Sequence, residues 1–137
     1  MDNDIVTLFC DVDDFCIIYE PQFNKWLLQD GSKKRIRKSK LILSEVMTIT
    51  IWFHASGYRT FKDYYKKEVI PHLQWAFHDL VSYNRFVELM SQALLPLFGC
   101  CIFIPHIYAI MYKYITPLYH TVHLLSTFFI DVFVHSW

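Results

Sequence analysis

The amino-acid sequence predicts a mainly α protein, a compact helical bundle, and three observations support this fold class. The 137 residues are 54% hydrophobic and 18% aromatic, which suits one domain with a single core. Only 3 glycines and 5 prolines interrupt the chain, which disfavours strand-rich barrels and excludes disordered or collagen-like classes. Apolar residues also recur at helical spacing along much of the first 97 residues.

The first two expected helices come from the N-terminal segment. Its apolar residues recur every three or four positions, which predicts an amphipathic helix from residue 5 to a stop near Pro21. The members of this apolar face are Ile5, Leu8, Phe9, Val12, Phe15, Cys16 and Tyr19. The sequence FNKWLLQDG predicts a second, short helix that ends at Gly31.

The run LILSEVMTITIWFHA, residues 41–55, is apolar on nearly every side. It contains many residues that favour strands, yet a length of about fifteen favours a buried helix. Glu45 falls in its expected first turn, and Gly57 is the expected stop.

Three further helices are expected between residues 61 and 95. Thr60 can cap FKDYYKKEVI, HLQWAFHDL forms a short helix after Pro71, and Ser82 can cap YNRFVELMSQALL. In the last of these, one apolar stripe is expected from Phe86, Val87, Met90 and Leu94. The joints in WFHASGYRTFKDYY and HDLVSYNRFVELM have the spacing of a helix-turn-helix, although ordinary helix packing also produces such joints.

The net charge of zero hides a strong asymmetry along the chain. Acids dominate the first 30 residues, where Lys25 is the one base. Six bases then fall within eight residues, namely Lys33, Lys34, Arg35, Arg37, Lys38 and Lys40. Such a cluster can neutralise several phosphates of a nucleic acid, and the alternative reading is a solvated basic loop. From Leu89 onward only Lys113 and Asp131 are charged.

Three motifs in order resemble one protein family. LFCDVDDFC (8–16), LSEVMTITIWFHASGYRTFKDYY (43–65) and LVSYNRFVELM (80–90) are similar to the N-terminal region of bacterial insertion-sequence transposases of the DDE type. The resemblance covers roughly residues 1–97. It implies a DNA-binding helical domain that recognises the terminal repeats of a mobile element and acts in DNA transposition and recombination.

The resemblance, together with the basic cluster, predicts a set of DNA-contacting residues. Backbone phosphates would be contacted by the basic cluster and by bases beside the helix joints, whereas base edges would be read by polar side chains at the start of a helix. The expected set is Lys33, Lys34, Arg35, Arg37, Lys38, Lys40, Arg59, Lys62, Asn84 and Arg85.

Catalysis in the resembled family needs three carboxylates in an RNase H-like domain, where they hold two metal ions, usually Mg²⁺. The family's first catalytic aspartate follows the LLPL-like segment in a strand reading approximately FIDST. Here FFIDVF contains Asp131, but Val132 replaces the hydroxyl residue and too few residues follow for two more ligands. We therefore expect no catalytic residue, no metal ligand and no cofactor in this chain.

The resemblance divides the chain into a transposase N-terminal helical domain, residues 1–97, and a divergent apolar tail of uncertain fold, residues 98–137. A frameshift or truncation after residue 97 is the favoured explanation of the tail. An alternative function is a small membrane-associated protein with an apolar C-terminal segment, although Pro96, Pro105 and Pro117 weaken it. A third is an enzyme completed by another chain.

The remaining chemistry-bearing residues favour no site. Asp11, Asp13 and Asp14 are expected to form a solvated acidic face, and the histidines His106, His120 and His123 lack the spacing of a zinc site. The four cysteines are expected to be reduced thiols, since they lack CxxC spacing. MDNDIVTLF carries acids where a secretory signal needs bases, so we expect a cytoplasmic protein. Whether it forms a homo-oligomer stays open.

Overall fold

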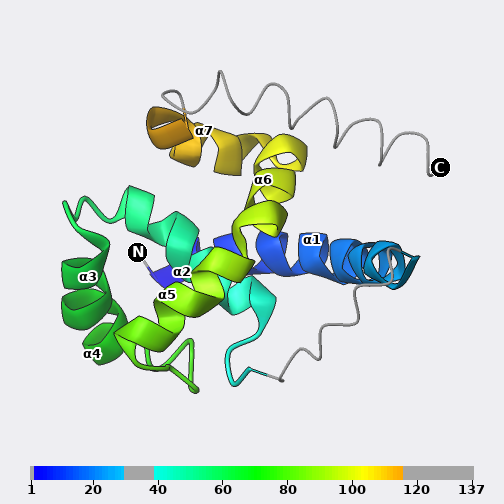
Figure 1. The fold of residues 1–137 in the computed structure, drawn as a ribbon. Helices are drawn as coiled ribbons and strands as arrows, with labels where there is room; N and C mark the ends of the chain where they lie inside the picture. The colour runs from blue at the N-terminus through cyan, green and yellow to red at the C-terminus, as the bar shows by residue number, and fades with distance from the viewer. Residues whose placement is uncertain (1, 30–38, 116–137) are drawn as a thin grey trace.

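The computed structural model describes residues 2–29 and 39–115, and within these ranges the chain is helical with no strand (Figure 1). The predicted mainly α bundle is confirmed. Figure 1 shows the two short helices α3 and α4 at one end of the molecule, with the C-terminal part of α1 at the opposite end. The elements are α1 (Asp2–Gln29), α2 (Leu43–Ala55), α3 (Phe61–Tyr64), the π-helical segment η1 (Tyr65–Val69), α4 (Ile70–His72), α5 (Tyr83–Gln92), α6 (Leu94–Phe103) and α7 (Pro105–Ile115).

Helix α2 is the central helix of the bundle, because it packs against α1, α5 and α7. Its buried residues are Ser44, Val46, Met47, Thr48, Ile49, Thr50 and Ile51. The hydroxyl groups of Thr48 and Thr50 donate to the carbonyl oxygens of Ser44 and Val46, each at 2.7 Å. These bonds satisfy the polar groups inside the helix, so threonine is tolerated in an apolar core.

The ends of α2 lie where the sequence predicted them. Glu45 accepts a hydrogen bond from the backbone N–H of Ile42 at 2.9 Å, which satisfies one donor before the first turn. Gly57 has a φ of 75° and directly follows Ser56, the C-cap residue of α2. A side chain at position 57 would be strained in this left-handed conformation, which is why glycine stops the helix there.

Helix α1 corrects the prediction of a stop near Pro21, because it continues through Pro21 to Gln29. The rings of Phe15, Tyr19 and Phe23 follow one another at four-residue spacing, with centroids 5.2 and 5.3 Å apart. Pro21 lies on the exposed side of the helix, where the carbonyl group that loses its partner can bind water. Stacking of these rings therefore stabilises the helix on both sides of Pro21. The segment FNKWLLQDG, expected to form a separate short helix, contributes its described residues to α1.

The segment HLQWAFHDL corrects a second prediction, because residues 73–82 form turns rather than a short helix. The backbone N–H groups of Ala76 and Phe77 both donate to the carbonyl oxygen of Leu73. Leu73 and Phe77 are buried, and the ring of Phe77 meets the ring of Phe9 on α1 edge to face, with centroids 6.3 Å apart. These contacts with α1 favour a compact loop over a continuous helix.

The helix expected at residues 83–95 divides into two. Ser82 caps α5 as predicted, accepting from the backbone N–H of Arg85 at 3.5 Å. Helices α5 and α6 then meet at Ala93 with a bend of 60°. Pro96 lies in the first turn of α6 and has no N–H for the carbonyl of Gln92, so the hydrogen-bond ladder ends there. The expected apolar stripe is broken as a result, and Leu94 is 53% exposed.

Helix α6 crosses the predicted domain boundary at residues 97 and 98, and the helices beyond it contribute to the core. Cys100, Cys101 and Ile107 are buried in the same cluster as the residues of α1 and α2. A Cβ atom built on Gly99 would lie 3.1 Å from the ring of Phe15, so the absence of a side chain lets α6 approach α1 closely. Residues 98–110 thus complete the core that residues 5–97 begin.

The four cysteines should differ sharply in reactivity towards a disulfide reagent at pH 8. Cys10 is exposed, whereas Cys16, Cys100 and Cys101 are buried. Burial raises the pKa of Cys16 to about 12 and that of Cys101 to about 11, and it also raises the pKa of Cys100. Since the thiolate is the reactive form, the buried thiols should react at least about a hundredfold more slowly. In native protein we expect one thiol per chain to react fast, and in guanidinium chloride we expect the other three to react as well. Any fast-reacting thiol in native Cys10→Ser protein would contradict this.

Candidate DNA-binding surface

The residues predicted to contact DNA fall into two groups in the structure. Lys33, Lys34, Arg35, Arg37 and Lys38 lie outside the described residues. The others all have exposed side chains and belong to the connection before α2, to the start of α3 and to the start of α5. They are Lys40, Arg59, Lys62, Asn84 and Arg85.

One of the two predicted helix-turn-helix joints is present. Helix α2 ends at Ala55, and the chain turns through Gly57 to Thr60, whose hydroxyl oxygen accepts from the backbone N–H of Asp63 at 3.3 Å. The prediction of a second joint in HDLVSYNRFVELM was wrong, since the residues before Ser82 form turns and not a helix. The helical stretch that follows the first joint, residues 61–72, is therefore the candidate for contact with DNA.

Residues 61–72 form one helical stretch through α3, η1 and α4, with a buried and an exposed side. On the buried side, the hydroxyl of Tyr64 donates to the carbonyl oxygen of Ile49 in α2 at 3.2 Å. The hydroxyl of Tyr65 donates to the carbonyl oxygen of Val81 at 2.7 Å. Both aromatic rings are fully buried, so they hold the stretch firmly against the core. The exposed side carries Lys62, Asp63, Lys66, Lys67, Ile70 and Pro71.

An aromatic cluster joins this stretch to the start of α5. The ring of Phe61 lies 5.5 Å from Phe86 and 6.4 Å from Tyr83, and the ring of Tyr65 lies 4.7 Å from Phe86, measured between centroids. Because Phe61 and Tyr83 each lie in the first turn of their helix, the two helix starts are neighbours. The structure thus brings together the expected contacts at residues 59–62 and those at residues 84–85.

Ion pairing separates the bases near the two helix starts into two kinds. Lys67 pairs with Asp63 at 3.4 Å, and Arg85 pairs with Glu88. Hydrogen bonds from Thr60 and Lys67 lower the pKa of Asp63, so this carboxylate stays ionised beside its lysine. In the part of the chain that the structure describes, Arg59, Lys62 and Lys66 have no ion pair. Their full charge faces the solvent.

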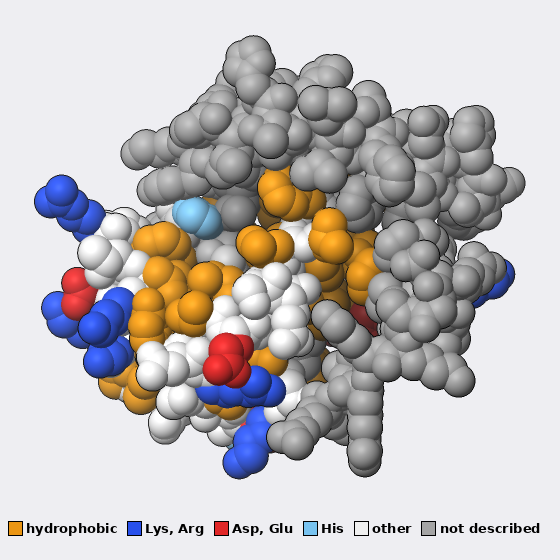
Figure 2. Space-filling model, viewed as in Figure 1, with side chains coloured by type: hydrophobic (Ala, Val, Ile, Leu, Met, Phe, Trp, Pro, Cys, Tyr) orange, Lys and Arg blue, Asp and Glu red, His pale blue; other side chains and the backbone are white. Residues whose placement is uncertain are grey.

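The surface that we call the cationic face therefore consists of Arg59, Lys62 and Lys66. Figure 2 shows lysine and arginine side chains gathered on the side of the molecule where α3 and α4 lie in Figure 1. The predicted set of contacts omitted Lys66, although its position four residues after Lys62 places both on one side of a helix. Helical spacing was the signal that could have identified it.

Among the described residues, no acid of α1 forms an ion pair with a base of the cationic face. Asp11, expected to be solvated, is half-buried and contacts His106 of α7 at 3.0 Å, so this carboxylate joins two helices. Asp14 is exposed as expected. Over residues 2–29 and 39–115, no three His, Cys, Asp or Glu side chains are grouped so that they could hold a metal ion. Asp131 lies outside the described residues.

The membrane alternative requires a helix that is long and apolar enough to cross a bilayer. No single helix in the described ranges is long and apolar enough to cross a membrane, whereas α5 and α6 together meet the criteria of length and composition but bend by 60°.

Comparisons with protein-family models, with curated proteins and with solved structures found no match to this chain. The transposase resemblance of the three sequence motifs stays a prediction.

Proposed function

We propose that this helical bundle is the DNA-binding part of an insertion-sequence transposase and that residues 61–72 contact the duplex. The observation that carries the proposal is the cationic face, whose three bases have no ion pair in the described part of the chain. Lys62 and Lys66 lie on the second helical stretch of a helix-turn-helix joint, the element that enters the major groove in proteins of that kind, and Arg59 lies in the turn just before it. The three sequence motifs that resemble such transposases add support.

The packing of residues 61–72 suits this role physically. A helix that contacts DNA must keep its orientation when its charged side binds phosphates. The hydroxyls of Tyr64 and Tyr65 fix this orientation, because they donate hydrogen bonds to backbone carbonyl oxygens of Ile49 and Val81. The twelve residues span about 18 Å at 1.5 Å per residue, which is long enough to lie across a major groove about 12 Å wide. In this proposal the chain supplies binding, and phosphodiester cleavage belongs to a domain that carries three carboxylates.

The start of α5 supplies the candidate for base contacts. Asn84 is exposed, and its amide can both donate to and accept from an adenine edge. Arg85 is paired with Glu88 and would have to leave this partner to contact a guanine. The free energy gained at the guanine is therefore reduced by the loss of the ion pair. We therefore assign phosphate contacts to the cationic face and base selectivity chiefly to Asn84.

The proposal is tested by measuring DNA affinity as a function of salt. Binding of the full chain to a 30-bp duplex from the DNA that flanks its gene should weaken steeply as NaCl rises, because each neutralised phosphate releases counterions. For Lys62→Gln/Lys66→Gln protein, the slope of log K against log [salt] should be shallower by about 1.8, since each phosphate contact contributes about 0.9. Gel shift or fluorescence anisotropy measures both quantities.

Matched variants make the result specific. Lys25 is an exposed lysine near the C-terminal end of α1, the end that lies opposite α3 in Figure 1, so Lys25→Gln should leave the slope unchanged. Asn84→Ala should reduce the preference for the flanking duplex over a shuffled one of equal composition. Failure to form any salt-sensitive complex would disprove DNA binding. Equal affinity for the flanking and shuffled duplexes would disprove recognition of the element's ends.

A further inference from the structure

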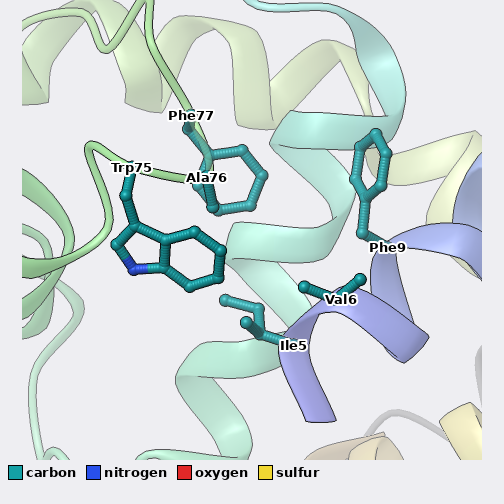
Figure 3. A pocket seen from close by; sticks show the side chains of 6 residues that line it. All are labelled: Ile5, Val6, Phe9, Trp75, Ala76 and Phe77. Atoms are coloured by element: carbon teal, nitrogen blue, oxygen red, sulfur yellow. The ribbon is translucent and has the colours of Figure 1, made fainter. Parts of the chain in front are cut away.

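An apolar pocket lies between the start of α1 and the loop at residues 73–82. Its volume is about 190 Å³, and the side chains that line it are all aliphatic or aromatic. Figure 3 shows side chains from the two segments facing one another across the space. They are Ile5, Val6, Phe9, Trp75, Ala76 and Phe77. A cavity of about 150 Å³ can hold benzene, so this one has room for one bulky aliphatic side chain.

The rim of the pocket exposes large apolar side chains that a bound group would cover. Trp75 is 50% exposed and Val6 is 44% exposed, whereas Ile5 and Phe77 are each only 2% exposed and form the floor. Covering the rim would remove apolar surface from water, and half-exposed tryptophans of this kind are common anchors at protein interfaces. The pocket thus favours an apolar occupant.

The charges of the two wall segments restrict the occupant further. Residues 2–24 and 73–84 contain no lysine or arginine. Asp13 lies one helical turn after Phe9 on the same side of α1, and Asp79 follows Phe77 in the loop. Neither aspartate has an ion pair with any described residue. The acids on these segments are Asp2, Asp4, Asp11, Asp13, Asp14, Glu20 and Asp79. An occupant with basic residues beside its apolar anchor would complement both walls.

We propose that this pocket is the docking site for a basic segment of a partner protein, which inserts one bulky aliphatic side chain beside Trp75 and places lysines or arginines near Asp13 and Asp79. None of the pocket residues belongs to the cationic face. The inference therefore stands independently of DNA binding and concerns a second, oppositely charged surface.

The test uses the full chain labelled with ¹⁵N and two synthetic nine-residue peptides. One peptide has a leucine between two runs of four lysines, and the other has serine in place of the leucine. The indole N–H signal of Trp75, assigned from its loss in Trp75→Phe protein, reports on the pocket directly. We expect the leucine peptide to shift this signal and to bind at least about tenfold more tightly than the serine peptide, since only the leucine buries apolar surface.

Two variants separate the apolar anchor from the charges. Ala76→Phe fills the pocket and should abolish the preference for leucine while leaving the serine peptide's affinity unchanged. Asp13→Asn/Asp79→Asn should weaken both peptides, whereas Glu88→Gln, which changes an exposed acid on α5, should weaken neither. Thermal melting by circular dichroism verifies that each variant is folded.

Three outcomes would overturn the proposal. Equal affinities for the two peptides would mean that the acids attract bases without the pocket. No shift of the Trp75 signal at about 1 mM leucine peptide would mean that the pocket takes no such side chain. A shift that depends on protein concentration alone would assign the pocket to a second copy of this chain.

Discussion

Phe86→Ala should lower the free energy of unfolding by about 3–5 kcal/mol, the range found when a buried phenylalanine is truncated. Phe86 is fully buried, and its ring contacts Tyr65 and Phe61, with centroids 4.7 and 5.5 Å away. The alanine leaves a cavity between α5 and the helical stretch of residues 61–72. Since small domains are stable by about 5–15 kcal/mol, the loss is a large part of the total. Urea denaturation followed by circular dichroism measures it.

Phe103→Ala is the matched control, because Phe103 is 54% exposed at the end of α6. We expect its cost to be below about 1 kcal/mol, as for most exposed positions. If the two alanine variants lost the same free energy, Phe86 would not be the centre of the contact between α5 and residues 61–72. A loss of DNA affinity in Phe86→Ala protein under conditions where it remains folded would further indicate that this cluster orients the cationic face.

A chain that ends at residue 97 should fail to form a cooperatively folded bundle. The truncation removes Cys100, Cys101 and Ile107 from the core and uncovers the side of α1 that carries Phe15. At about 1.5–3 kcal/mol for each buried side chain, the lost burial is about 4.5–9 kcal/mol, comparable to the whole stability of a small domain. We expect a broad thermal transition and a near-ultraviolet circular dichroism signal that is largely lost.

The control for this truncation is a chain ending at residue 115, which keeps every described helix. It should melt in one sharp transition, because it keeps the whole described core. This comparison also tests the predicted domain boundary at residues 97 and 98. A sharp transition for the chain of 97 residues would support that boundary and would show that α6 and α7 are dispensable for the core.

Local signals in the sequence predicted several features correctly. Thr60 and Ser82 were expected to cap helices and do so, because a hydroxyl oxygen before a first turn satisfies a backbone N–H that the helix leaves unpaired. Gly57 was expected to end a helix and has the left-handed conformation that glycine adopts without strain. These outcomes depend on groups within a few residues of one another, so the sequence contains all the information they need.

In residues 15–23 and 72–80 the observed structure differs from the one that local preferences predict. Pro21 disfavours a helix by itself, but stacked rings on either side of it keep α1 continuous. HLQWAFHDL has a helix-compatible pattern, yet contact of Phe77 with Phe9, some seventy residues earlier in the chain, favours a loop. The second free-energy balance includes packing against an element that the local sequence does not identify, whereas the ring stacking beside Pro21 is local and follows from four-residue spacing.

The candidate site divides in the same way. The sequence alone identified Arg59, Lys62, Asn84 and Arg85 by their charge or polarity, but the fold decided that the starts of α3 and α5 are neighbours. Arg85 contacts Glu88, while Lys66 joins Lys62 on the exposed side of residues 61–72. Helical spacing predicts these local relations, whereas the contact between the two helix starts depends on packing between segments that are distant in sequence.

The sequence by itself determined that this chain is mainly α, where α2, α3 and α5 begin, and that its charges are segregated along the chain, since these properties follow from composition and from neighbours close in sequence. Only the tertiary structure decided that α6 and α7 complete the core, that the starts of α3 and α5 are neighbours, and that an apolar pocket lies between acidic segments. The physical reason is that burial and ring packing between helices are set by residues far apart in the chain, and folding brings them into contact.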